Sequence, residues 1–117
     1  MQQERKIDYV EMPAADMQAT REFFNGLFGW QFTEYGPDYM DFTDGRIAGG
    51  FRRSAVSMDA EAGSALVVFY AKDLESLEAR IRELGGVIST ATFAFPGGHR
   101  FHFRDPNGNE FAVWSDQ

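Results

Sequence analysis

The two halves of this 117-residue chain repeat one order of structural signals. With an offset of 57 residues, the helix-starting Asp16 aligns with Asp73 and the helix-ending Gly29 aligns with Gly86. Each half predicts a strand, a helix and then three strands, so its single helix covers only one face of its sheet. Two such units complete their burial by bringing their sheets together. The repeat therefore predicts an α+β fold of two tandem βαβββ modules, with sheets that curve around a shared cleft.

Turn and capping residues set the predicted boundaries. Module one spans about residues 5–53, and module two spans about 65–117. Between them lies the small, polar and weakly periodic segment 54–64, which predicts a linker. The predicted helices are 16–28 and 73–84. The predicted strands are 6–12, 30–34, 39–43, 47–53, 65–70, 87–95 and the two arms of a hairpin over 100–114.

The closing hairpin carries the strongest local signal. Asp105-Pro106-Asn107-Gly108 combines the residue types that favour a tight turn, and apolar residues alternate with polar ones on both sides of it. Alternation places the residues of each arm on two opposite faces. The apolar face holds Phe101, Phe103, Phe111 and Val113. The other face holds Arg100, His102, Arg104, Glu110, Ala112 and Trp114. A face that combines imidazole, carboxylate, guanidinium and indole groups indicates a functional surface.

Composition excludes several classes of function. The formal charge of −7 disfavours nucleic-acid binding, which depends on a basic surface. The absence of cysteine excludes a thiol nucleophile, thiolate metal ligands and disulfides. The N-terminus lacks the apolar run of a signal peptide, and no stretch is long enough to span a bilayer. We therefore expect no membrane partner and a cytoplasmic location.

The motifs together resemble the vicinal oxygen chelate superfamily. The first half contributes Asp16, Phe23-Phe24 and Leu27-Phe28-Gly29-Trp30, and the second contributes Asp73, Leu84-Gly85-Gly86 and Phe103 to Glu110. That superfamily includes glyoxalase I, bleomycin-resistance proteins, fosfomycin-resistance enzymes and extradiol dioxygenases. The resemblance covers nearly the whole chain. It implies the paired βαβββ fold and a homodimer.

Strand alternation also predicts which residues line the cleft. If apolar positions face the helices, a set of aromatic and charged residues faces the other way. The ligand-binding candidates are Tyr9, Tyr39, Arg52, Tyr70, Arg100 and Trp114. Mostly aromatic walls with a few charges are typical of a pocket for a small organic molecule. The alternative is that Tyr9, Tyr70 and Trp114 are core or dimer-contact residues.

The resemblance further implies one divalent metal ion, held by His and Glu residues from four strands. The matching positions here are Tyr9, one of residues 48–50, Leu66 and Ala112, and they lack the usual imidazole and carboxylate ligands. We therefore expect no metal cofactor. The alternative is one divalent ion at a noncanonical site formed by Glu11, His102 and Glu110, which would support a lactoylglutathione lyase-like or dioxygenase reaction.

The same three residues are the candidate catalytic groups. His102 flanked by Glu11 or Glu110 is suited to general acid–base catalysis. Alternatively, His102 is a neutral hydrogen-bonded side chain, and the carboxylates form ion pairs with Arg100 or Arg52. The sequence therefore predicts a glyoxalase-like protein that binds a small molecule, or an unassigned enzyme of that superfamily. A purely structural interaction domain is the third possibility.

Overall fold

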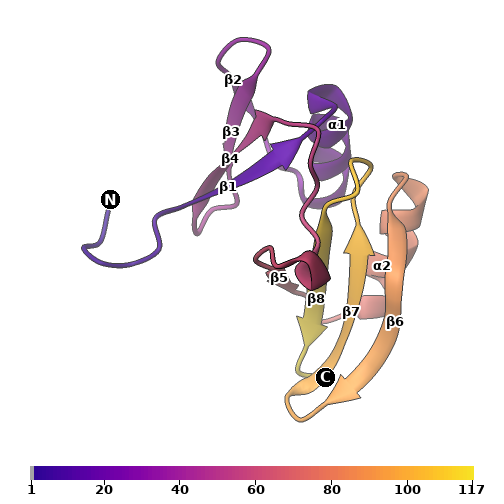
Figure 1. The fold of residues 1–117 in the computed structure, drawn as a ribbon. Helices are drawn as coiled ribbons and strands as arrows, with labels where there is room; N and C mark the ends of the chain where they lie inside the picture. The colour runs from indigo at the N-terminus through magenta and orange to yellow at the C-terminus, as the bar shows by residue number, and fades with distance from the viewer. Residues whose placement is uncertain (1) are drawn as a thin grey trace. The chain divides into compact units, whose positions relative to one another are not determined.

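The computed structural model describes residues 2–117 and divides into two compact units, one ending at Val56 and the other spanning Ser57–Gln117. Each unit contains a four-stranded mixed sheet and one α-helix (Figure 1). The predicted α+β fold of two tandem βαβββ modules is confirmed at this level.

Unit 1 follows the predicted order of strand, helix and three strands. Its strand order in the sheet is β1-β4-β3-β2, with β1 parallel to β4 and the other pairs antiparallel. The elements are β1 (Tyr9–Ala14), α1 (Met17–Phe28), β2 (Thr33–Glu34), β3 (Tyr39–Thr43) and β4 (Ala48–Arg53).

Unit 2 repeats this topology after a short 3-10 turn. Its strand order is β5-β8-β7-β6, again with the first strand of the module parallel to the last. The elements are η1 (Ala60–Ala62), β5 (Val67–Tyr70), α2 (Leu74–Glu83), β6 (Val87–Phe95), β7 (Gly98–Arg104) and β8 (Glu110–Ser115).

The helix boundaries follow the capping residues that the repeat identifies. The Asp16 carboxylate accepts the backbone N–H of Ala19 at 3.0 Å, and Asp73 accepts that of Ser76 at 3.1 Å. Gly29 ends α1 in the left-handed conformation, with φ at 74°. In the second unit this conformation belongs to Gly85, with φ at 96°, so the repeat slips by one residue at the helix C-terminus.

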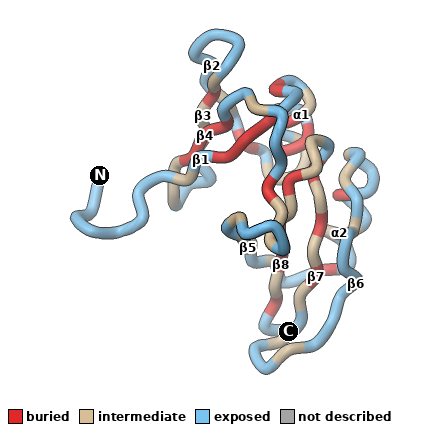
Figure 2. The backbone as a smooth tube through the Cα atoms, viewed as in Figure 1, coloured by how far each residue is buried: buried red, intermediate tan, exposed pale blue. Residues whose placement is uncertain are grey.

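Aromatic rings form the core of unit 1. Phe24 of α1 stacks on Trp30 at 4.8 Å between ring centroids, and Trp30 stacks on Phe42 of β3 at 4.0 Å. Phe51 of β4 completes the cluster and is fully buried. Figure 2 shows buried stretches of backbone in red, among them the end of β1 and part of α1. The expected strand over 30–34 is shorter than predicted, because Trp30 packs in this core and pairing with β3 begins only at Thr33.

In unit 2, the predicted alternation of the closing hairpin is confirmed. Phe101, Phe103, Phe111 and Val113 are all fully buried. Phe103 stacks on Phe111 at 5.3 Å, and Phe69 of β5 packs against both rings. Their burial leaves the alternate residues of β7 and β8 on the opposite face, where the candidate site lies.

The segment predicted as a linker is more ordered than its composition indicates. Met58 is buried, its N–H donates to the side-chain oxygen of Asn109 at 2.7 Å, and its carbonyl accepts the N–H of Glu110 at 2.9 Å. Ser57 donates to the carbonyl of Asn107 at 3.2 Å. Residues 57–60 therefore lie against the hairpin turn of unit 2.

Candidate functional site

The turn between β7 and β8 fixes the position of the site. One carboxylate oxygen of Asp105 accepts the backbone N–H groups of Asn107 and Asn109, at 3.0 and 2.9 Å. Gly108 has a φ of 86°, which is easily adopted only by glycine. The other oxygen of Asp105 is buried without a hydrogen-bond partner. Burial raises the pKa of Asp105 to about 6, although the backbone N–H groups act in the opposite direction.

A chain of three side chains runs across β7 and β8 in unit 2. Nδ1 of His102 lies 2.9 Å from a carboxylate oxygen of Glu110, and Nε2 lies 3.0 Å from the Nη2 of Arg100. A guanidinium group can only donate, so Nε2 is the acceptor and Nδ1 carries the hydrogen. His102 is therefore a neutral imidazole that donates to Glu110 and accepts from Arg100.

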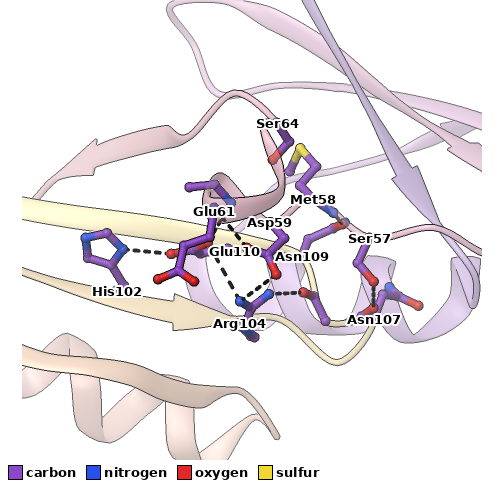
Figure 3. A network of polar contacts seen from close by, with 12 residues as sticks. Ser57, Met58, Asp59, Glu61, Ser64, His102, Arg104, Asn107, Asn109 and Glu110 are labelled. Atoms are coloured by element: carbon purple, nitrogen blue, oxygen red, sulfur yellow. Dashed lines mark hydrogen bonds and ion pairs between the residues drawn. The ribbon is translucent and has the colours of Figure 1, made fainter.

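The Glu110 carboxylate is held from several sides (Figure 3). Its second oxygen accepts the backbone N–H of Ala60 at 2.9 Å and lies 3.7 Å from Arg104. The hydrogen bond from His102, followed by that from Ala60, lowers the pKa of Glu110. Arg104 also lies 3.5 Å from Asp59 and donates to the carbonyl of Gly108 at 2.8 Å, so its charge is compensated within this network.

A small pocket adjoins this network. It has a volume of about 170 Å³ and is lined by residues from η1 and its N-cap, β6, β7 and β8. The lining residues are Asp59, Glu61, Ser89, Thr90, Arg104 and Glu110. The charged side chains of Asp59, Arg104 and Glu110 therefore line a concave, polar pocket.

Aromatic side chains surround the other end of the polar chain. In the sheet register, Arg100 lies opposite Phe93 of β6 and Trp114 of β8. Trp114 contacts Tyr70 of β5 edge to face at 5.1 Å and Phe95 at 6.3 Å. Tyr70 and Phe93 are 48% and 40% exposed. The face thus offers aromatic contact area around one guanidinium group.

The phenol of Tyr70 has a fixed partner. It donates to a carboxylate oxygen of Asp116 at 2.6 Å. This hydrogen bond raises the pKa of Tyr70 and lowers that of Asp116. The bond orients the Tyr70 ring beside Trp114.

Unit 1 has its own polar and aromatic face. The hydroxyls of Tyr9 and Tyr39 form a short hydrogen bond, and Glu11 lies beside the Tyr39 phenol. Desolvation, followed by the interactions with Tyr9 and Glu11, raises the pKa of Tyr39. Glu11 also pairs with Arg52 at 3.5 Å. The two phenol oxygens fill the space directly above Gly50, where a side chain on β4 would project.

This geometry bears on the divalent metal ion that the fold family implies. At residue 50, one of the β4 positions that match a metal ligand, a side chain would need the space that the two hydroxyls occupy. On β8, the matching position Ala112 has only a methyl group and lies opposite His102 in the register. Within residues 2–117, no cluster of three or more His, Asp or Glu side chains is arranged to hold a metal ion. The residues at these positions do not fit a His and Glu metal centre.

The structure assembles the predicted site residues in two sets, one in each unit. Unit 2 brings together Arg100, His102, Glu110, Tyr70 and Trp114, whereas unit 1 brings together Tyr9, Glu11, Tyr39 and Arg52. Their roles in binding or catalysis remain predictions.

Sequence reasoning missed several members of the unit 2 face. Asp59 and the Ala60 N–H lay in the segment treated as a linker, where no pattern indicated a contact with Glu110. Phe93 and Phe95 are two residues apart, and this spacing could have placed both rings on one face of their strand.

None of the helices in residues 2–117 combines the length and apolar character needed to cross a membrane.

Comparison with solved structures identifies the fold. A glyoxalase/bleomycin resistance protein/dioxygenase family enzyme from Burkholderia phytofirmans PsJN superimposes with a TM-score of 0.78 at 17% identity, covering 95% of this chain and all of that one. The fosfomycin resistance protein FosX from Mesorhizobium loti superimposes with a TM-score of 0.74 at 15% identity, and the match covers 95% of this chain and 92% of FosX. Lactoylglutathione lyase from Agrobacterium tumefaciens superimposes with a TM-score of 0.70 at 23% identity, and the match covers 95% of this chain and 93% of the lyase. At these identities the likeness concerns the fold.

Among curated proteins, the chain is similar to two anthracycline biosynthesis proteins, DauV from Streptomyces sp. (strain C5) and DnrV from Streptomyces peucetius. Each is 28% identical over 124 residues, a match that covers 91% of this chain and 45% of the relative. The chain thus spans less than half the length of these relatives. The family model described as Glyoxalase/Bleomycin resistance protein/Dioxygenase superfamily matches residues 6–113. With this match over almost its entire length, and with the paired βαβββ topology, the chain belongs to the Glyoxalase/Bleomycin resistance protein/Dioxygenase superfamily.

Proposed function

We propose that this protein binds a small organic molecule on the aromatic and polar sheet face of unit 2, without the divalent metal ion of its metal-dependent relatives. The observation that carries the proposal is the combination of two exposed rings, Tyr70 and Phe93, with the ordered chain Arg100–His102–Glu110 on one face. Small-molecule sites are lined mainly by aromatic and apolar side chains with a few fixed polar groups, and this face has that composition.

The order of the polar groups supports binding over a passive surface. The side chains of His102 and Glu110 are only 16% and 12% exposed, and each is fixed by hydrogen bonds. Such preorganisation reduces the entropy cost of forming contacts with a ligand.

The metal-free part of the proposal rests on the donor set. The positions that match metal ligands in the family carry a phenol, glycines and small or apolar side chains. The imidazole of His102 has both nitrogens engaged, one with Glu110 and one with Arg100. A metal ion at His102 would need Arg100 to move away and would place two positive charges side by side.

The two curated relatives are named for anthracycline biosynthesis. Anthracyclines are small organic molecules, so these names support a ligand of this class for the present chain. Because the chain spans 45% of their length, the proposal extends to binding and not to the activity of the longer proteins.

Two measurements on the untagged full chain test the proposal. Native mass spectrometry of freshly purified protein should detect a co-purified small molecule or binding from a panel of aromatic compounds, and Trp114→Ala should weaken that binding. Elemental analysis should find only substoichiometric metal. A stoichiometric Ni, Zn or Fe ion that is lost in His102→Ala would contradict the metal-free proposal.

Membership of this superfamily also supports a homodimer, which we include in the proposal. Size-exclusion chromatography with light scattering should give about twice the 13.2 kDa chain mass. A monomeric mass at all accessible concentrations would remove this part of the proposal and leave ligand binding to stand on its own tests.

A further inference from the structure

We infer that Arg100 is the anchor for an anionic group and that the ligand of unit 2 is a small aromatic carboxylate. This inference rests on the proposed function and deepens it by naming a ligand class. Three observations of unit 2 carry it: the charge of Arg100 has no counter-ion among residues 2–117, its guanidinium is held in a defined orientation, and aromatic rings flank it on both neighbouring strands.

The missing counter-ion is the first observation. Arg100 makes no ion pair with any carboxylate of residues 2–117, and its Nε is buried without a hydrogen-bond acceptor. The nearby Arg104 differs, because it pairs with Asp59 and Glu110. A buried donor without an acceptor costs about 1 to 3 kcal/mol, so such a group needs an explanation. A carboxylate from a ligand would supply the missing negative charge.

The orientation of the guanidinium is the second observation. Glu110 accepts the hydrogen on Nδ1 of His102, which leaves the lone pair of Nε2 directed at Arg100. His102 and Glu110 are thus positioning residues that act through Arg100. A guanidinium group fixed in this way can present two parallel N–H groups to one carboxylate.

The aromatic surroundings are the third observation. Phe93 lies opposite Arg100 on β6, with the guanidinium carbon 6.0 Å from the ring centroid, and Trp114 lies opposite on β8. Tyr70 extends the aromatic surface beyond Trp114. An aromatic ligand can contact these rings while its carboxylate reaches Arg100. An aliphatic acid or a neutral aromatic molecule would use only one of these two features.

The test compares 2-naphthoate with its neutral analogue 2-naphthamide by isothermal titration calorimetry on the full chain. We expect the carboxylate to bind about 10- to 100-fold more tightly, which corresponds to a charged hydrogen-bonded pair. Arg100→Gln should abolish this preference and leave amide binding nearly unchanged, whereas Arg100→Lys should retain part of it. Arg82→Gln, which removes an exposed arginine of α2 in the same unit, is the matched control and should keep the full preference.

The positioning role of His102 has its own comparison. His102→Leu should reduce the carboxylate preference, whereas His102→Gln should restore most of it, because a glutamine amide can donate to Glu110 and accept from Arg100 at once. If His102 had only a structural role, His102→Leu and His102→Gln would reduce the carboxylate preference equally when their thermal stabilities are equal.

The outcomes separate this inference from the proposed function. Equal affinities for the two probes, or an unchanged preference in Arg100→Gln, would overturn the inference while leaving a small-molecule site in place. Failure of the wild-type chain to bind either probe would overturn the inference, and the absence of any co-purified or panel ligand would in addition overturn the proposed function.

Discussion

Two single residues, Asp105 and Gly50, have structural roles that their residue types alone do not reveal. Asp105 is a turn residue by sequence, yet it is 3% exposed and has one carboxylate oxygen without a partner. Gly50 is a strand glycine by sequence, yet its missing side chain makes room for two phenol hydroxyls. Both features are measurable as changes in stability.

Asp105 should make stability depend on pH in an unusual direction. Burial raises its pKa from 3.8 to about 6, so the folded chain binds this proton more tightly than the unfolded chain. Its contribution to stability is therefore complete below the unfolded value and is lost as the pH rises through about 6. Asp105→Asn removes this titration. As the pH rises from about 4 to 6, the free energy of unfolding of the variant should therefore increase by about 1 to 3 kcal/mol relative to that of the wild type.

Urea denaturation at a series of pH values measures this difference. The exposed Asp8→Asn serves as the control and should follow the wild-type profile. Parallel profiles for Asp105→Asn and wild type would show that the buried carboxyl does not titrate in this range.

Gly50→Ala should destabilise the chain by about 1 to 3 kcal/mol, because a methyl group at this position collides with the hydroxyls of Tyr9 and Tyr39. Chemical denaturation gives the value. The loss should be smaller when the same substitution is made in a Tyr9→Ala, Tyr39→Ala background. An equal loss in both backgrounds would place the strain elsewhere on β4.

At the scale of elements, the ordering of the inter-module segment depends on the hairpin turn. The side chain of Asn109 is fully buried and accepts the Met58 N–H at 2.7 Å, while Glu110 accepts the Ala60 N–H. These bonds couple residues some 50 positions apart in the chain. The turn thereby supports both the segment before β5 and the carboxylate of the candidate site.

Asn109→Ala tests this coupling. It should cost about 1 to 3 kcal/mol, because the Met58 N–H loses its acceptor inside the protein. Amide hydrogen exchange at Met58 and Ala60 should accelerate more than exchange within α2. Ser57→Ala, which removes an exposed hydrogen bond of the same segment, should change stability by less than about 0.5 kcal/mol. Unchanged exchange at Met58 in Asn109→Ala would contradict the coupling.

The sequence predicts features that depend on neighbouring residues better than features that depend on contacts between distant parts of the chain. Asp16 and Asp73 predicted the helix starts, and alternation predicted the faces of the closing hairpin, because caps and strand parity depend on neighbouring residues. The prediction that Trp30 lies in a strand is wrong, because the position of Trp30 is set by stacking on Phe42, a tertiary contact that the local sequence does not reveal.

The same limit applied to the candidate site. Alternation placed Arg100, His102 and Glu110 on one face, but their hydrogen-bond order and the missing counter-ion of Arg100 require coordinates. The contact of the Ala60 N–H with Glu110 joins distant segments, and the sequence contains no local signal for it.

For the whole molecule, the repeat determines the architecture of each unit, and the residues at the family's metal-ligand positions do not fit a His and Glu metal centre. Both units keep a helix-covered apolar face and an opposite face with polar and aromatic residues, as the tandem topology requires. The positions that match the family's metal ligands carry no imidazole or carboxylate group, whereas unit 2 presents an oriented arginine between aromatic rings. The fold alone therefore does not fix the chemistry of the site, which has to be argued from the residues present.

Metal addition should therefore leave the protein unchanged. Zn²⁺, Ni²⁺ or Fe²⁺ added to chelator-treated protein should not raise its thermal midpoint, because a ligand stabilises the fold only in proportion to its binding. The expected result is identical melting curves with and without each ion. A midpoint that rises with metal in wild type but not in His102→Ala would reveal a site at His102.

The most direct test of the account is an NMR titration of the full chain with small aromatic molecules in the presence of a chelator. The largest shift changes should occur at the Trp114 indole and at Arg100, His102 and Tyr70, and they should saturate without any metal. The proposed metal-free site on unit 2 would be contradicted if these resonances stayed unchanged while others moved, or if they moved only after a divalent metal was restored.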